Sequence, residues 1–342
     1  MLTTPHLTTP HENLDPARLF AGCETLSGLL LAVSGGPDSL ALMRLAAQWR
    51  ENGAKVPLFV ATVDHGLREN AAAEAKAVRE WARALDLPQE TLVWSGDKPR
   101  RAIQERAREA RYALLFAHAR RLGAAAVATG HHADDQWETV LFRLARGSGI
   151  AGLAGMARQQ NFPDGRLIRP LLAVPKQALV DFCREAGQEF FDDPSNSNPD
   201  FARTKLRALA SPLQKLGFSR EMAQKLAERA KKASEAIDWS AQQILDRAAL
   251  SPDADVYDLG QMSGAPRAVL EHCLSLALTR AAGCAPQRLD RLEYLAQKLS
   301  AALEKGEDLR LTLGGCLIAL NRKKILTIRR EGPRRRGIQA EP

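Results

Sequence analysis

The amino-acid sequence predicts an α/β protein with a doubly wound, mostly parallel sheet, a mainly helical C-terminal domain and a small β appendage. Over residues 28–172, short β-rich runs alternate with helical patterns, which is typical of parallel strands joined by crossover helices. After Pro170 the β pattern fades into mostly helical sequence up to about Leu303. Alternation returns over residues 309–328, which indicates a few short strands.

Four units of strand, turn and helix form the predicted sheet. The first strand is an unbroken apolar run at 29–33 that ends at glycines, and apolar residues with helical spacing follow it over 40–49. The other strands are predicted at 58–63, 90–93 and 124–129. The helix after the second strand ends near residue 85, and the helices after the third and fourth strands cover 103–122 and 134–146. Ligands of doubly wound sheets bind outside the carboxyl ends of the strands, so the loops after these strands are candidate sites.

Composition is that of an ordinary globular protein. Of the 342 residues, 45% are hydrophobic and 26% are charged, and no apolar run approaches the length of a membrane span. The five cysteines are scattered without a Cys-x-x-Cys pair, which indicates reduced thiols in the cytoplasm. A formal charge of +8 and a pI near 9.4 favour a polyanionic partner, although charge alone does not distinguish nucleic-acid binders from other basic proteins.

The first candidate site is the loop at the end of the first predicted strand. Two glycines let backbone N–H groups approach phosphate oxygens, serine hydroxyls add donors, and the following helix offers its positive end. The loop lacks the Gly-Lys-Ser/Thr of P-loops and the Gly-x-Gly-x-x-Gly of dinucleotide binders. A plain strand-to-helix turn is the alternative, but such a turn does not need this residue pattern. The loop residues are Ser34, Gly35, Gly36, Pro37, Asp38 and Ser39.

A second group of polar residues directly follows the fourth predicted strand. If a helix begins near Asp134, Asp135 and Glu138 lie at i and i+3 on one face, and Asp134 is placed to cap the free N–H groups. The two carboxylates could bind Mg²⁺ or hold a substrate ammonium group. The alternative is a cap followed by a solvated first turn. His131 and His132 lack a third nitrogen or sulfur ligand nearby, which disfavours zinc.

The loop resembles that of the PP-loop ATP pyrophosphatases, which have an adenine nucleotide α-hydrolase-like fold and cleave ATP between its α and β phosphates. Within that superfamily the sequence is similar to tRNA(Ile)-lysidine synthetases over about residues 28–210, with the run 145–155 as the most specific part. The matching segments are 34–39, 63–68, 107–112, 129–156, 193–196 and 203–207. One departure is Thr204, where many relatives have asparagine.

This resemblance implies a two-step reaction on the wobble cytidine of an isoleucine tRNA with a CAU anticodon. ATP adenylates the C2 oxygen of the base, and the ε-amine of free L-lysine then displaces AMP. Asp38 would work with Mg²⁺ near the phosphates, while Asp135 and Glu138 would bind the lysine amine or Mg²⁺. Arginines would stabilise phosphate charge or the activated base, and those that match the family are Arg111, Arg203 and Arg207.

With the resemblance, the chain divides into five predicted parts. They are a flexible N-terminal arm (1–27), a PP-loop ATP-binding catalytic domain (28–214), a helical tRNA-binding domain (215–304), a small β appendage (305–330) and a basic flexible tail (331–342). The arginines Arg334, Arg335 and Arg336 of the tail either contact RNA or only solubilise the terminus. The sequence is compatible with a homodimer.

Three other functions compete with this interpretation. A PP-loop tRNA thiolase needs cysteines brought together for sulfur relay or an iron–sulfur cluster, and the scattered cysteines disfavour it. A PP-loop synthetase acting on a small acid would leave the basic C-terminal half unexplained. An RNA-binding protein with a merely structural loop would not need Asp38, Asp135 and Glu138.

Overall fold

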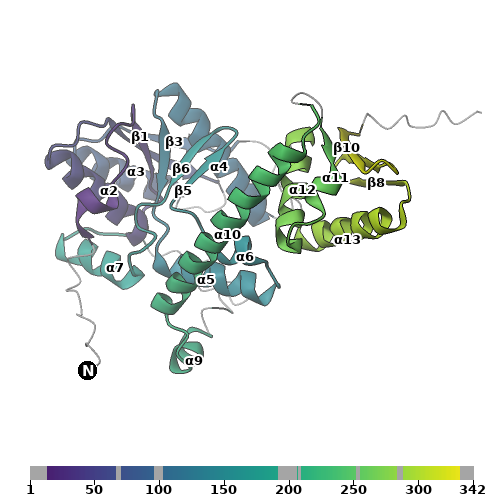
Figure 1. Cartoon of the computed structure of the whole chain (residues 1–342). Coiled ribbons are helices and arrows are strands. Elements are labelled where there is room, and N and C mark those ends of the chain that lie inside the picture. The colour runs from purple at the N-terminus through teal and green to yellow at the C-terminus, as the bar shows by residue number, and fades with distance from the viewer. Residues whose placement is uncertain are drawn as a thin grey trace, which may run out of the picture. The chain divides into compact units, whose positions relative to one another are not determined.

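The computed structural model describes residues 14–66, 71–95, 103–191, 206, 209–251, 255–282 and 288–331 (Figure 1). By its internal contacts the chain divides into two compact units. The first contains residues 1–146 and 155–227, and the second contains residues 147–154 and 228–342. The predicted domain boundaries at 214 and 304 stay predictions beside this division.

A six-stranded sheet with the strand order β3-β2-β1-β4-β6-β5 forms the centre of the first unit. All neighbouring strands are parallel except β5 and β6, which form an antiparallel hairpin at one edge. The strands are β1 (Leu29–Ala32), β2 (Leu58–Asp64), β3 (Gln89–Val93), β4 (Ala126–Thr129), β5 (Gln159–Phe162) and β6 (Gly165–Ile168).

Helices cover both faces of this sheet, as a doubly wound fold requires. Alternate residues of β1 point to opposite faces, so Leu29 and Leu31 belong to one core cluster and Leu30 to the other. The first cluster contains residues of α1 (Pro16–Leu19), α2 (Pro37–Glu51), α3 (Ala71–Ala84) and α7 (Lys176–Glu185). The second is covered by α4 (Ile103–Arg121).

The strand order places a topological switch point between β1 and β4. From β1 the chain moves outward to β2 and β3 and then returns to β4, which pairs with the free side of β1. At such a point the loops that leave the two strands diverge, and a ligand can enter between them. The loop after β1 leads into α2, and the loop after β4 leads into α5 (Ala133–Ala145).

Helices and a small antiparallel sheet share one core in the second unit. The sheet has the order β7-β10-β9-β8. Its strands are β7 (Val256–Asp258), β8 (Leu309–Leu313), β9 (Cys316–Leu320) and β10 (Ile325–Arg330). The helices are α6 (Ile150–Leu153), α11 (Leu259–Met262), α12 (Arg267–Ala282) and α13 (Leu289–Lys305), together with most of α10 (Arg220–Ala248), whose first turns belong to the first unit with α9 (Ala210–Lys215).

These observations confirm the predicted fold class, including the four parallel strands at their predicted places. The β5–β6 hairpin and β7 were not predicted, because β5 is polar and mostly exposed and β7 has only 3 residues. Within the described ranges no helix is long and apolar enough to cross a membrane.

Candidate active site

Internal hydrogen bonds shape the loop between β1 and α2. Gly35 has a φ of 89°, a left-handed conformation that favours glycine, and Pro37 occupies the first turn of α2. The Ser39 hydroxyl donates to the Gly36 carbonyl (2.9 Å) and accepts from the Ser34 N–H (3.1 Å). The hydroxyl predicted to reach a phosphate is therefore already used to fix the loop.

Two backbone donors of this loop remain available. Within the described part of the chain, no hydrogen bond uses the N–H of Gly35 or of Gly36. The Gly35 carbonyl faces the other way, because it accepts the N–H of Phe191 at 2.9 Å. Consecutive free N–H groups ahead of a helix N-terminus can bind an anion, and the phosphate site expected at this loop stays a prediction.

Gly130, the residue after β4, packs directly against the start of α2. A Cβ atom on Gly130 would lie 2.8 Å from the Asp38 carbonyl oxygen and 2.9 Å from its carbonyl carbon. Both atoms belong to the backbone, so a side chain at residue 130 would push the two loops apart. The sequence interpretation did not single out this glycine, because the contact depends on β1 and β4 being neighbours.

His132 connects the two candidate carboxylates across the switch point. Its Nε2 atom lies 3.4 Å from Oδ2 of Asp38 and 3.5 Å from Oδ2 of Asp135. Burial opposes the charged imidazole, but the hydrogen bond to Asp38 and the nearby carboxylates outweigh it and raise the pKa of His132. The structure therefore brings Asp38 and Asp135 together through His132, which was considered only as a zinc ligand.

His132 also begins α5, which corrects the predicted role of Asp134. The N-cap of α5 is His132, whose Nδ1 accepts the Asp135 N–H, while the Asp135 carboxylate accepts the His132 N–H at 3.1 Å. Asp134 does not cap this helix. Its carboxylate accepts the N–H of Lys176 at 2.9 Å and pairs with Arg220, so it joins α5 to the starts of α7 and α10.

Carboxylate oxygens near this point suit a cation. Oδ1 of Asp38 is buried and has no hydrogen-bond partner among the described residues. Glu138 is 3% exposed and lies one turn along α5 from Asp135. The described residues hold no group of three or more His, Cys, Asp or Glu side chains arranged as a complete metal site. Mg²⁺ does not need one, since it commonly uses one or two carboxylates together with substrate phosphates and water.

His131 lies in a partly buried and positively charged environment. Burial lowers the pKa of His131 to about 3, and the charges of Arg169, Arg108 and Arg111 add to this effect against the opposing charge of Asp135. The ring is therefore neutral at physiological pH, and its Nδ1 lies 2.8 Å from the Thr129 hydroxyl. Arg111, predicted to stabilise phosphate charge, thus lies close enough to act electrostatically on the loop after β4.

The run 145–155, the most specific part of the resemblance, ends against α5. Gln136 exchanges two hydrogen bonds with the backbone of Met156 (2.7 and 3.1 Å), and Arg143 donates to the Gly155 carbonyl at 2.7 Å. Gly155 has a φ of 68°, and a Cβ there would lie 2.7 Å from the Gln136 amide. These contacts explain why a glycine occupies this position and fix the chain as it enters β5.

The remaining predicted site residues fall outside the described residues. They are Arg203 and Arg207, and the matching segment 193–196 and the tail arginines Arg334, Arg335 and Arg336 also lie there. Their predicted roles stay predictions.

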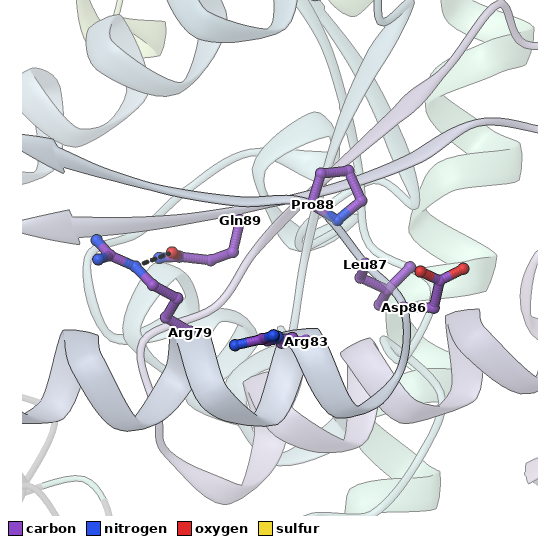
Figure 2. A pocket seen from close by; sticks show the side chains of 6 residues that line it. All are labelled: Arg79, Arg83, Asp86, Leu87, Pro88 and Gln89. Atoms are coloured by element: carbon purple, nitrogen blue, oxygen red, sulfur yellow. Dashed lines mark hydrogen bonds between the residues drawn. The ribbon is translucent and has the colours of Figure 1, made fainter.

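A pocket of about 360 Å³ lies elsewhere, at the amino end of β3 (Figure 2). Arg79 and Arg83 of α3 line it, and Arg79 donates to the Gln89 side chain at 3.2 Å. Because the strands are parallel, this end of the sheet is opposite the carboxyl ends that carry Asp38 and Asp135. The pocket is therefore separate from the candidate active site.

Residues 10–213 match the model of a family described as the PP-loop domain. Together with the loop after β1 and the switch point beside it, this match makes the chain a PP-loop protein, a class whose members use ATP.

Two relatives identify the family more closely. The chain is 43% identical over 342 residues to the tRNA(Ile)-lysidine synthase of Rhodopseudomonas palustris, covering 96% of this chain and 98% of the relative. It is 44% identical over 316 residues to that of Methylobacterium nodulans, covering 91% and 92%. The chain belongs to the tRNA(Ile)-lysidine synthase family, and the resemblance seen in the sequence is confirmed.

Among solved structures, the chain is similar to the U34-tRNA thiolase NcsA from Methanococcus maripaludis with its [4Fe-4S] cluster. The TM-score is 0.54 at 17% identity, and the match covers 64% of this chain and 78% of the thiolase. This likeness shows the shared fold alone. In the part of this chain that the structure describes, Cys23, Cys183, Cys273 and Cys316 are buried, in no arrangement that could hold a metal ion.

Proposed function

We propose that this chain ligates L-lysine to C2 of the wobble cytidine of the CAU-anticodon isoleucine tRNA, which changes its codon from AUG to AUA. The reaction forms a carbon–nitrogen bond and consumes ATP. Family membership supports the reaction class. One observation supports the place where the reaction would occur. The free N–H groups of Gly35 and Gly36 and the carboxylates of Asp38 and Asp135 lie at the same switch point of the sheet.

In the first step the C2 oxygen of the base attacks the α-phosphorus of ATP, and pyrophosphate leaves. The N–H groups of Gly35 and Gly36 would hold the pyrophosphate part, because preorganised donors stabilise charge that develops on the leaving group. Arg111 lies close enough to His131 to act on it electrostatically, and its positive charge would favour the crowded phosphates.

We also propose that Mg²⁺ takes part, with Asp38 as its main ligand. The buried Oδ1 of Asp38, which lacks a hydrogen-bond partner among the described residues, fits this role. When bound, Mg²⁺ would neutralise charge on the leaving pyrophosphate, which accounts for the absence of a lysine from the loop. The hydrogen bond between His132 and Asp38 would hold the carboxylate in position for this ligand.

In the second step the ε-amine of lysine attacks C2, AMP leaves, and the amine loses a proton. Asp135 and Glu138 would hold the amine, since a carboxylate near the nucleophile both attracts the ammonium group and can accept its proton. Glu138 is buried, and the attraction between its carboxylate and a charged amine would be stronger there than in water, because the protein interior has a low dielectric constant. Arg203 and Arg207 would stabilise the activated base. We place the protein in the cytoplasm, where its tRNA substrate is found.

The test is to follow pyrophosphate, AMP and RNA-linked lysine with a panel of purified tRNAs. We expect pyrophosphate release to need ATP, Mg²⁺ and the isoleucine tRNA, and radiolabelled lysine to become RNA-linked. The methionine tRNA with the same CAU anticodon is the matched control and should not react. Asp38→Ala should abolish adenylation, because losing a phosphate-site carboxylate costs several kcal/mol of transition-state stabilisation.

Two results would overturn the proposal. If sulfur and not lysine enters the RNA, the protein is a thiolase. If Asp38→Ala turns over at the rate of the unaltered protein, the nucleotide is not activated at this loop.

A further inference from the structure

Helix α10 presents a continuous outward stripe in the second unit. Its inward positions Ala241, Leu245 and Ala248 belong to the core of that unit. On the opposite side, residues spaced three or four apart form one line, because such residues are neighbours on a helix surface. These residues, all exposed, are Arg229, Lys232, Ala236, Trp239, Gln243 and Arg247, which we call the α10 stripe.

Trp239 is the unusual member of the α10 stripe. Its side chain is 68% exposed, the highest value for an aromatic residue in the described part of the chain. A large aromatic ring in water gains nothing for folding, and exposed tryptophan is enriched where proteins bind partners. Its neighbours one turn away on the stripe are Ala236 and Gln243, so no large side chain of the stripe covers the ring.

Beside the α10 stripe, the exposed carboxylates of Glu228 and Glu235 pair with Lys232 and Lys231 of α10. Two other carboxylates of α10 turn toward α12, where Asp238 pairs with His272 and Asp246 pairs with Arg280 at 3.1 Å. On the α10 stripe the charged residues are all cations. Lys232 pairs with Glu228 at 3.2 Å, an exposed ion pair that contributes little and can be exchanged for another anion.

We propose that the α10 stripe is a binding surface for the sugar-phosphate backbone of the substrate tRNA, with Trp239 stacked on an unpaired base or ribose. The proposal rests on the function proposed above and names how this part of the chain holds that substrate. From Arg229 to Arg247 the stripe is about 27 Å long, enough to follow several successive phosphates. Proteins that bind RNA without sequence preference commonly combine cations, which contact the phosphates, with an exposed aromatic ring, on which a base stacks.

A second copy of the chain fits the stripe less well. A stable interface between copies needs about 800 Å² from each partner and a core depleted of charge. The α10 stripe has one large apolar residue between three cations, so pairing two identical stripes would place like charges against each other.

The experiment measures tRNA affinity and its salt dependence with the full chain. Trp239→Ala should raise the Kd for the isoleucine tRNA at least about fivefold, while Trp239→Phe keeps most of the affinity because the ring can still stack. Replacing Arg229, Lys232 and Arg247 with Gln should lower the salt slope of log Kd by about one for each phosphate that these cations neutralise. The kcat at saturating tRNA should not change in any of these variants.

Tyr294 and Lys298 of α13 provide a matched control in the same unit. Tyr294 is 57% exposed, and the Lys298 ammonium lies 5.4 Å from its ring centroid. The double variant Tyr294→Ala, Lys298→Gln removes the same kinds of group and should leave Kd and salt slope unchanged.

The outcomes separate this inference from the proposed function. If the unaltered protein neither binds nor modifies the tRNA, the proposed function fails. If the unaltered protein does both and the stripe variants bind equally well, the α10 stripe is not an RNA surface. A Trp239→Ala variant with unchanged Kd and a lower sedimentation coefficient would assign the stripe to an interface between copies instead.

Discussion

Replacing Gly36 with alanine separates the folding of the phosphate loop from its proposed use. Gly36 has φ −78° and ψ 161°, which any residue can adopt, and an added Cβ would meet only the Phe191 carbonyl oxygen at 3.8 Å and the Ser34 hydroxyl at 4.0 Å. Neither contact is a clash, so the free energy of unfolding should change by less than about 1 kcal/mol. An ATP phosphate that approaches the Gly36 N–H would, however, meet the methyl group.

We therefore expect Gly36→Ala to raise the KM for ATP at least about tenfold, which corresponds to about 1.4 kcal/mol of lost binding. The assay is ATP-dependent pyrophosphate release at saturating tRNA and lysine, with urea unfolding as the measure of stability. Gly264→Ala is the control, since nothing lies within 4 Å of the Cβ it would add. A Gly36→Ala protein with normal stability and a normal KM for ATP would refute the assignment of this loop to the nucleotide.

Three further substitutions test other contacts. Gly130→Ala forces a methyl group against the backbone at the start of α2, and should cost about 1–3 kcal/mol in urea unfolding; an unchanged midpoint would show that the two loops are not in contact. Asp134→Ala leaves Arg220 and the first N–H of α7 without their carboxylate, and should cost about 1–3 kcal/mol without raising the KM for lysine; a raised KM would make Asp134 part of the site. His118 is 5% exposed, and burial lowers its pKa, so the folded chain binds a proton there less readily than the unfolded chain, in which histidine titrates near pH 6.5. Stability should therefore fall between about pH 7.5 and about pH 5.5 by more in the unaltered protein than in His118→Gln, and equal losses would contradict this.

The fold could be predicted where burial alone dictates the pattern. Strand β1 is apolar at every position because helices cover both of its sides, and such a run followed by glycines has few other interpretations. Strand β5 could not be predicted, since three of its four residues are exposed at an edge and need no apolar side chain. Its strand structure comes from pairing with β6, which is a tertiary contact.

The sequence motifs indicate candidate site residues, but the contacts between these residues could not be predicted. Asp38 and Asp135 were identified from the motifs around them, whereas the link through His132 depends on the pairing of β1 with β4. Asp134 was assigned as the cap because aspartate is a common N-cap residue. The structure gives this position to His132, whose ring nitrogen accepts the same kind of N–H group.

The helix that carries the proposed RNA stripe begins beside α5, the helix that carries Asp135 and Glu138. Trp137 and Val140 of α5 form one buried cluster with Ala223 and Ala227 in the first turns of α10. These α5 residues alternate with Asp135 and Glu138 along the same two turns, so a shift of α10 against this cluster would also move the carboxylates. Because α10 is a single uninterrupted helix from Arg220 to Ala248, its first turns help to fix the position of α5 and, with it, of Asp135 and Glu138.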